Sequence, residues 1–156
     1  MSGRKHIIVT GGSRGLGAAM IDGLLADGHR VSTCSRSKSE TIEHFSAAHG
    51  DAFFWQSAQV GEADQVDAFV KAAGEWADDD GIYGLVNNAG IARTGILASF
   101  PNIESERIIQ INLIGAIQMA RAVSPYMLKR DDGGRIVNIS SIIGHRGYNG
   151  MSAYSA

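Results

Sequence analysis

The sequence predicts an α/β protein in which helices cover both faces of a doubly wound parallel β-sheet. Two observations carry this prediction. Short apolar segments alternate with helical segments along the 156 residues, and such alternation is typical of parallel strands joined by right-handed helical crossovers. Glycines also gather where the predicted strands end, which favours a ligand lying close to the backbone at that edge of the sheet.

The first half of the chain is expected to contain three strands and two helices. Residues 7–10 read Ile-Ile-Val-Thr, a short apolar strand, and residues 16–26 follow as a helix. A second strand is expected at 31–35, a weaker helix at 40–48, and a third strand beginning at 52–55.

A helix expected at 62–77 opens the second half of the chain. It places Val66, Phe69, Val70 and Ala73 at positions i, i+3, i+4 and i+7, which gives one apolar face. The remaining elements are expected as a strand at 85–87, one long helix at about 104–127, a strand at 135–139 and a last helix that starts near Tyr154.

Composition describes an ordinary globular protein, and we expect residues 1–156 to form one domain. The chain is 44% hydrophobic and 19% charged, and its net charge of −2 argues against a nucleic-acid partner. No apolar run approaches the roughly 18 residues of a membrane span. Cys34 is the only cysteine, so no internal disulfide forms, and the N-terminus lacks an apolar signal segment. We therefore expect a cytoplasmic protein that binds neither membrane nor metal.

A glycine-rich loop, Thr10–Gly17, joins the first strand to the first helix. Gly11 permits the tight turn, Gly15 lets the backbone approach a pyrophosphate, and Gly17 lets the helix pack against the strand. The helix N-terminus then offers N–H groups and a positive dipole to the phosphates. No Gly-Lys-Ser/Thr follows, so the loop is not a P-loop. The sequence therefore predicts a dinucleotide site that includes Ser13, Arg14 and Leu16.

The end of the second strand indicates which dinucleotide binds. An acidic residue there would hold a ribose 2′-hydroxyl, whereas a basic residue accommodates a 2′-phosphate. Residues 33–36 read Thr-Cys-Ser-Arg without an acid, and Arg14 can approach the same side. Two guanidinium groups suit one phosphate. We therefore favour NADP(H) over NAD(H), held in part by Ser35 and Arg36; in the alternative, Arg36 is a solvated surface residue.

From this point the chain resembles the short-chain dehydrogenase/reductase family, whose members have a Rossmann fold. Thr10–Gly17 is similar to the family's glycine motif, and Asn87–Gly90 is similar to the motif after its fourth strand. Asn112, Ser141 and Tyr154 fall where the family has its catalytic asparagine, serine and tyrosine. Within this family the chain is most similar to the 3-oxoacyl-[acyl-carrier-protein] reductase-like members.

The resemblance implies an oxidoreductase that interconverts a carbonyl and a secondary alcohol by hydride transfer. Tyr154 would protonate the carbonyl oxygen, Ser141 would donate a hydrogen bond to it, and Asn112 would order a water in a proton relay. Each residue also has a structural alternative: a satisfied buried amide, a capping serine and a packed aromatic ring. The neighbouring Ser140 fits the role of a loop or helix-capping serine better.

The resemblance also implies further cofactor contacts. Asn88, Ala89 and Gly90 would line the adenosine and nicotinamide riboses, and Tyr154 would contact the cofactor as well as the substrate. Where the family often has an aspartate for the adenine amino group, this chain has Gln59 before Val60. A glutamine carbonyl can accept the same hydrogen bond, so we expect a weak adenine contact there.

The family's lysine, four residues after its tyrosine, would fall at position 158, beyond Ala156. We expect that the sequence is part of a longer reductase, interrupted within the helix that starts near Tyr154, and that the fragment alone is inactive. Alternatively, it is one half of a split enzyme, or a truncated NADP-binding protein without catalysis. Expected partners are a small carbonyl, alcohol or acyl-thioester substrate and, by resemblance, further copies in a dimer or tetramer. An apolar stripe at Ile109, Leu113 and Ile117 is either sheet packing or a partner face.

Overall fold

Five parallel strands form a single sheet in the order β3-β2-β1-β4-β5. The structure is a computed structural model that describes residues 3–78 and 81–156. The strands are β1 (His6–Thr10), β2 (Arg30–Ser35), β3 (Phe53–Ser57), β4 (Gly84–Asn87) and β5 (Arg135–Asn138). This sheet confirms the predicted doubly wound α/β fold, which is Rossmann-like.

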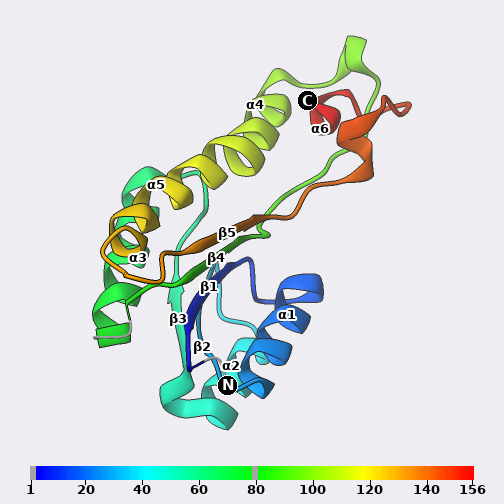
Figure 1. Ribbon diagram of the computed structural model, residues 1–156. Coiled ribbons are helices and arrows are strands. Elements are labelled where there is room, and N and C mark those ends of the chain that lie inside the picture. The colour runs from blue at the N-terminus through cyan, green and yellow to red at the C-terminus, as the bar shows by residue number, and fades with distance from the viewer. Residues whose placement is uncertain (1–2, 79–80) are drawn as a thin grey trace.

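Helices cover both faces of the sheet (Figure 1). On one side lie α1 (Gly15–Ala26) and α2 (Glu40–His49), and on the other lie α3 (Ala63–Ala77) and α5 (Gly115–Met127). The chain also forms α4 (Asn102–Ile109) and a short α6 (Ser152–Ser155). No described helix is both long enough and apolar enough to cross a lipid bilayer.

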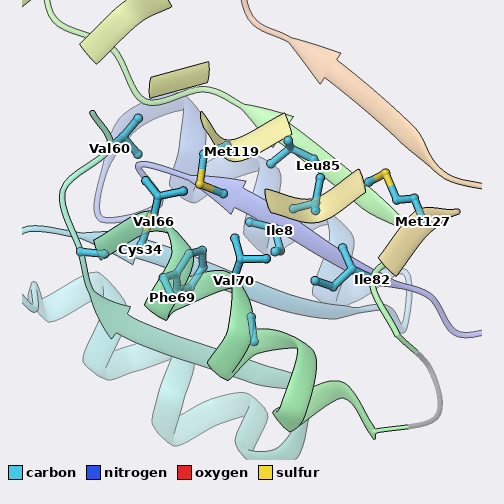
Figure 2. Packing of buried hydrophobic residues seen from close by; sticks show 13 residues of the cluster. Ile8, Cys34, Val60, Val66, Phe69, Val70, Ile82, Leu85, Met119 and Met127 are labelled. Carbon is cyan, nitrogen blue, oxygen red and sulfur yellow. The ribbon is translucent and has the colours of Figure 1, made fainter. Parts of the chain in front are cut away.

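The apolar face predicted for α3 is confirmed. Its members Val66, Phe69, Val70 and Ala73 are all buried, and they share one cluster with Met119 of α5 and with residues of the central strands (Figure 2). A second cluster lies on the opposite face, beneath α1 and α2. Both faces of the central strands are therefore covered, as parallel sheets require.

The long helix predicted at about 104–127 is present, but it contains a π-helical turn that the sequence did not indicate. The segment begins earlier, as α4, passes through a π-helical turn at Gln110–Ile114, and continues as α5. Two side chains of the π-helical turn bond to loops outside the helix: Gln110 donates to the carbonyl of Gly61 at 2.6 Å, and Asn112 bonds to Ile91. We attribute the local widening to these tertiary bonds, which apolar periodicity does not encode. Single π-helical turns are frequent at functional sites.

The sheet topology creates a switch point between β1 and β4 and leaves β5 as an exposed edge strand. Neighbouring strands β1 and β4 have connections that run in opposite directions from the sheet centre, and ligands of such sheets bind at that switch point, outside the carboxyl ends of the strands. At the edge, all four residues of β5 are exposed, including Ile136 at 41% and Val137 at 49%. The switch point therefore positions the site, and β5 leaves apolar surface exposed.

Candidate cofactor site and catalytic residues

A cavity of about 520 Å³ opens at the carboxyl ends of β1, β2 and β4. Every cofactor-binding residue predicted above except Tyr154 lines it. These residues are Gly11, Ser13, Arg14, Gly15, Leu16, Gly17, Ser35, Arg36, Gln59, Val60, Asn88, Ala89 and Gly90. The fold thus brings four separate sequence segments to one cavity.

The glycine loop has the geometry of an anion cradle. Gly11 and Gly15 have φ angles of +73° and +57°, a backbone region that favours glycine. A Cβ at Gly17 would lie 2.7 Å from Nδ2 of Asn88 and closer still to the carbonyl oxygen of Gly11. The first turn of α1 carries neither a side-chain cap nor an acidic residue, so its backbone N–H groups are left to bind an anion.

Two threonines fasten the loops of the cavity. The hydroxyl of Thr10 accepts from the backbone N–H groups of Asn88 and Ala89 at 3.0 and 2.9 Å. The buried hydroxyl of Thr33 donates to the carbonyl of Val9 at 2.6 Å and accepts from the N–H of Gly12 at 3.1 Å. Sequence reasoning assigned no role to Thr33, and because its strand also contains Ser32 and Ser35, residue type alone did not single it out.

The charge in the cavity is entirely positive. Arg14 and Arg36 are the only charged residues that line it, and both are exposed. Within the described part of the chain, neither guanidinium forms an ion pair. Gln59 also lines the cavity; its side chain donates from Nε2 to Glu62 at 3.3 Å, a bond that does not use its carbonyl oxygen. The charge of the lining therefore favours an anionic ligand.

Six lining residues were not predicted as site residues: Cys34, Ser37, Ser39, Ala58, Ile91 and Ile111. Most of these residues are next to a predicted site residue in the sequence, and that adjacency was the only sequence feature that could have identified them. Burial raises the pKa of the Cys34 thiol to about 12, which keeps the thiol protonated and unreactive at neutral pH. Cys34 therefore contributes apolar surface rather than chemistry.

Asn112 lies beside the cavity rather than in its lining. Its Oδ1 accepts from the N–H of Ile91 and its Nδ2 donates to the carbonyl of Ile91, both at 2.8 Å. The residue is half-buried, and its neighbour Ile111 lines the cavity with Ile91. These bonds are those of the satisfied structural amide that was the alternative interpretation, and they couple the π-helical turn to the loop after β4.

Ser141 and Tyr154 lie on adjacent elements beyond β5. Ser141 caps a 3₁₀ turn at Ile142–His145, where its hydroxyl accepts from the N–H of Ile143 at 3.2 Å. Of the loop or capping role expected for Ser140, the loop position is confirmed, and the capping role belongs to Ser141 instead. Tyr154 is half-buried on α6, which contacts both this turn and α4 (Figure 1). Neither residue lines the cavity, but the Ser141 hydroxyl keeps its proton available for donation.

Comparison with known proteins gives one consistent result. The sequence profile described as short chain dehydrogenase matches residues 5–156. A 3-oxoacyl-[acyl-carrier-protein] reductase of Synechocystis sp. is 36% identical over 96% of this chain and 60% of the relative. A reductase of the same description from Staphylococcus aureus is 34% identical over 97% of this chain and 62% of the relative. The chain thus spans about 60% of the length of these relatives.

Solved structures agree with the sequence comparison. A short-chain dehydrogenase from Streptomyces avermitilis superposes with a TM-score of 0.90 at 29% identity, over 98% of this chain and 55% of that one. A short chain dehydrogenase from Mycobacterium smegmatis has a TM-score of 0.87 at 24% identity, covering 97% of this chain and 63% of its own; this second likeness concerns the fold alone. The protein described here belongs to the short-chain dehydrogenase family of oxidoreductases, whose members use a nicotinamide dinucleotide.

Proposed function

We propose that this chain belongs to an NADP(H)-dependent oxidoreductase that interconverts a carbonyl and a secondary alcohol. The observation that carries the choice of NADP(H) is the charge of the cavity: two unpaired guanidiniums, from Arg14 and Arg36, and no carboxylate in its lining. A 2′-phosphate would find bidentate partners there. A cofactor with a free ribose 2′-hydroxyl would find no carboxylate acceptor.

The proposed roles follow from where each group lies. The glycine loop and the N-terminus of α1 would hold the pyrophosphate, and Gln59 would accept from the adenine amino group. The nicotinamide supplies or accepts the hydride when the cofactor is bound. Tyr154 would give its phenolic proton to the carbonyl oxygen, and Ser141, whose hydroxyl already accepts from Ile143, would donate a hydrogen bond to the same oxygen. Asn112 would hold the loop after β4 through Ile91.

Arg36→Ala tests the choice of cofactor. Removing one charge-assisted contact should weaken NADPH binding by about tenfold to hundredfold, while NADH binding changes by less than about twofold. Isothermal titration calorimetry at fixed salt measures both affinities. Lys38→Ala is the matched control, because it removes a positive charge from the same turn at a position outside the cavity lining. If both variants weaken NADPH equally, or if the unaltered protein prefers NADH, the proposal is wrong.

The substrate class is also proposed. Two relatives that this chain matches are described as 3-oxoacyl-[acyl-carrier-protein] reductases, and a third, from Nostoc sp., as a ketoacyl reductase. We propose a 3-oxoacyl thioester or related ketone for the whole enzyme. Oxidation of NADPH with a 3-oxoacyl thioester, followed by absorbance at increasing substrate concentration, tests this class; reduction of simple ketones without any thioester reduction would contradict it.

We further propose that the 156-residue chain binds NADP(H) without turnover by itself. Support comes from the three catalytic candidates, which lie outside the cavity lining, and from the exposed apolar residues of β5. This proposal also covers the alternative of an NADP-binding subunit completed by another segment. Purified chain should bind NADPH but show no substrate-dependent NADPH oxidation, and measurable turnover would overturn the proposal.

Exposed apolar side chains support a homo-oligomer. Within the stripe defined above, Leu113 is 50% exposed and Ile117 is 55% exposed, so these two residues do not pack on the sheet. We propose that the stripe contacts further copies in a dimer or tetramer. Light scattering coupled to size exclusion should show a multiple of 16.5 kDa, and Ile117→Asp should shift the measured mass towards that of the monomer.

The single free cysteine accords with a cytoplasmic location, which we also propose.

A further inference from the structure

A hydrogen-bond chain joins β3 to the turn after β2. The indole Nε1 of Trp55 donates to the hydroxyl of Ser35 at 2.9 Å, and that hydroxyl donates to the carbonyl of Ser37 at 2.8 Å. Ser35 has one hydroxyl proton, so its donor capacity is used within the turn. The residue therefore cannot donate to a phosphate while this chain is intact, although it lines the cavity.

The backbone on both sides of Arg36 is fastened to β3. Besides the bond to Ser37, the hydroxyl of Ser57 donates to the carbonyl of Arg36 at 3.1 Å, and the N–H of Ala58 donates to the carbonyl of Ser35 at 3.2 Å. In contrast, the guanidinium of Arg36 is exposed and has no ion pair with any residue of the described ranges. The turn thus fixes the main chain and leaves the cation available.

The other end of the hydrogen-bond chain is anchored in apolar packing. Trp55 is half-buried and packs against the cluster of buried residues beneath α1 and α2. A turn held against such a cluster is ordered before any ligand arrives, and an ordered turn avoids the loss of conformational entropy on binding. Because Ser35 has used its proton, discrimination of a 2′-phosphate depends on how well the Arg36 turn is held.

We propose that Trp55 is a positioning residue that sets the preference for NADP(H) by holding the Arg36 turn through Ser35. Trp55 itself does not line the cavity and acts through the turn rather than by contact with the cofactor. The inference rests on the proposed function, in which Arg36 binds a 2′-phosphate.

Trp55→Phe keeps an aromatic ring and removes the N–H donor. Calorimetric titrations compare NADPH with NADH, and 2′,5′-ADP with 5′-AMP. The first member of each pair carries a 2′-phosphate that the second lacks, so each comparison measures the contribution of that group. We expect Trp55→Phe to weaken binding of the two ligands that carry a 2′-phosphate by about threefold to tenfold, and to leave the affinities of the other two unchanged. Trp76→Phe is the matched control, because Trp76 is the only other tryptophan in the sequence. It lies at the end of α3, where its backbone carbonyl accepts from the side chain of Arg30 on β2 rather than bonding to the Arg36 turn.

A double variant separates positioning from a general structural effect. In a Ser35→Ala background the chain is already broken, so Trp55→Phe should no longer alter the ratio of NADPH to NADH affinity. Ser57→Ala, which releases the carbonyl of Arg36, should lower that ratio independently. The inference is overturned if Trp55→Phe weakens all four ligands equally, or if it changes none while the unaltered protein prefers NADPH. A protein that shows no such preference before mutation refutes the proposed cofactor instead, and the inference with it.

Discussion

Gly17→Ala and Gly23→Ala place the same methyl group at two positions of one helix, α1, and should have opposite effects. An alanine at Gly17 would bring its Cβ to 2.7 Å from Nδ2 of Asn88 and to 3.0 Å from the carbonyl carbon of Gly11. Nothing lies within 4 Å of a Cβ at Gly23. Neither position has a positive φ angle, so backbone strain does not distinguish them.

The magnitudes follow from this geometry. At Gly23, replacing glycine within a helix should stabilise the fold by about 0.5–1 kcal/mol. At Gly17 the same gain is offset by overpacking against backbone atoms that cannot rotate away, which costs about 1–3 kcal/mol. Each kcal/mol shifts the Tm of a protein of this size by about 2–4 °C. Gly23→Ala should therefore melt above the unaltered protein, and Gly17→Ala should melt below it.

Ligand binding provides a second measurement. Relief of the overlap at Gly17 requires the glycine loop to move away from Asn88, and both lie in the cofactor cavity. NADPH affinity measured by calorimetry should therefore fall by about tenfold or more for Gly17→Ala, which corresponds to roughly 1.4 kcal/mol. Gly23→Ala should bind as tightly as the unaltered protein. Equal melting temperatures and equal affinities for the two variants would refute the close approach described for Gly17.

Three further outcomes are expected. Gly74→Ala should lower the free energy of unfolding by a net amount of about 1–2 kcal/mol, because its Cβ would lie 2.8 Å from Cζ of Tyr126; urea denaturation measures this, and an unchanged midpoint would contradict it. Asp132 has its pKa lowered to about 2, mainly by a side-chain hydrogen bond from Arg130, so its stabilising effect is present above about pH 4 and lost as the pH falls towards 2. The urea midpoint of the unaltered protein should exceed that of Asp132→Asn at pH 6 and approach it near pH 2; a gap that persists at pH 2 would argue against the ion pair. Cys34, buried and with its pKa raised to about 12, should react with Ellman's reagent only after unfolding, and rapid labelling of the native protein would disprove its burial.

Local patterns were sufficient for most of the fold. Each predicted strand is present within two residues at its ends, including the third, expected at 52–55 and found at Phe53–Ser57. The four apolar positions of α3 are buried as their spacing indicated. The glycine loop and the segment after β4 were found from residue type and order alone, because a tight turn and close backbone approach restrict those positions to particular residues.

Other features of the site depend on contacts between distant segments. The π-helical turn at Gln110–Ile114 follows from bonds to Gly61 and Ile91, and apolar periodicity at this helix gave no indication of it. Ser141 rather than Ser140 caps because the 3₁₀ turn begins at Ile142. Neither assignment could be made from sequence, because each depends on which side chain meets which loop after folding.

The sequence by itself determined the alternation of strands and helices, the glycine loop and the family. These properties are local, since each depends on residues within a turn or on a periodicity of two or 3.6 residues. Only the tertiary structure decided that Gly17 is crowded while Gly23 is open, that Thr33 holds the glycine loop, and that Trp55 reaches the turn of Arg36. The side-chain bonds of Thr33 and Trp55 join residues that are 21 and 20 positions apart, and only the packing of the sheet brings such residues within hydrogen-bonding distance.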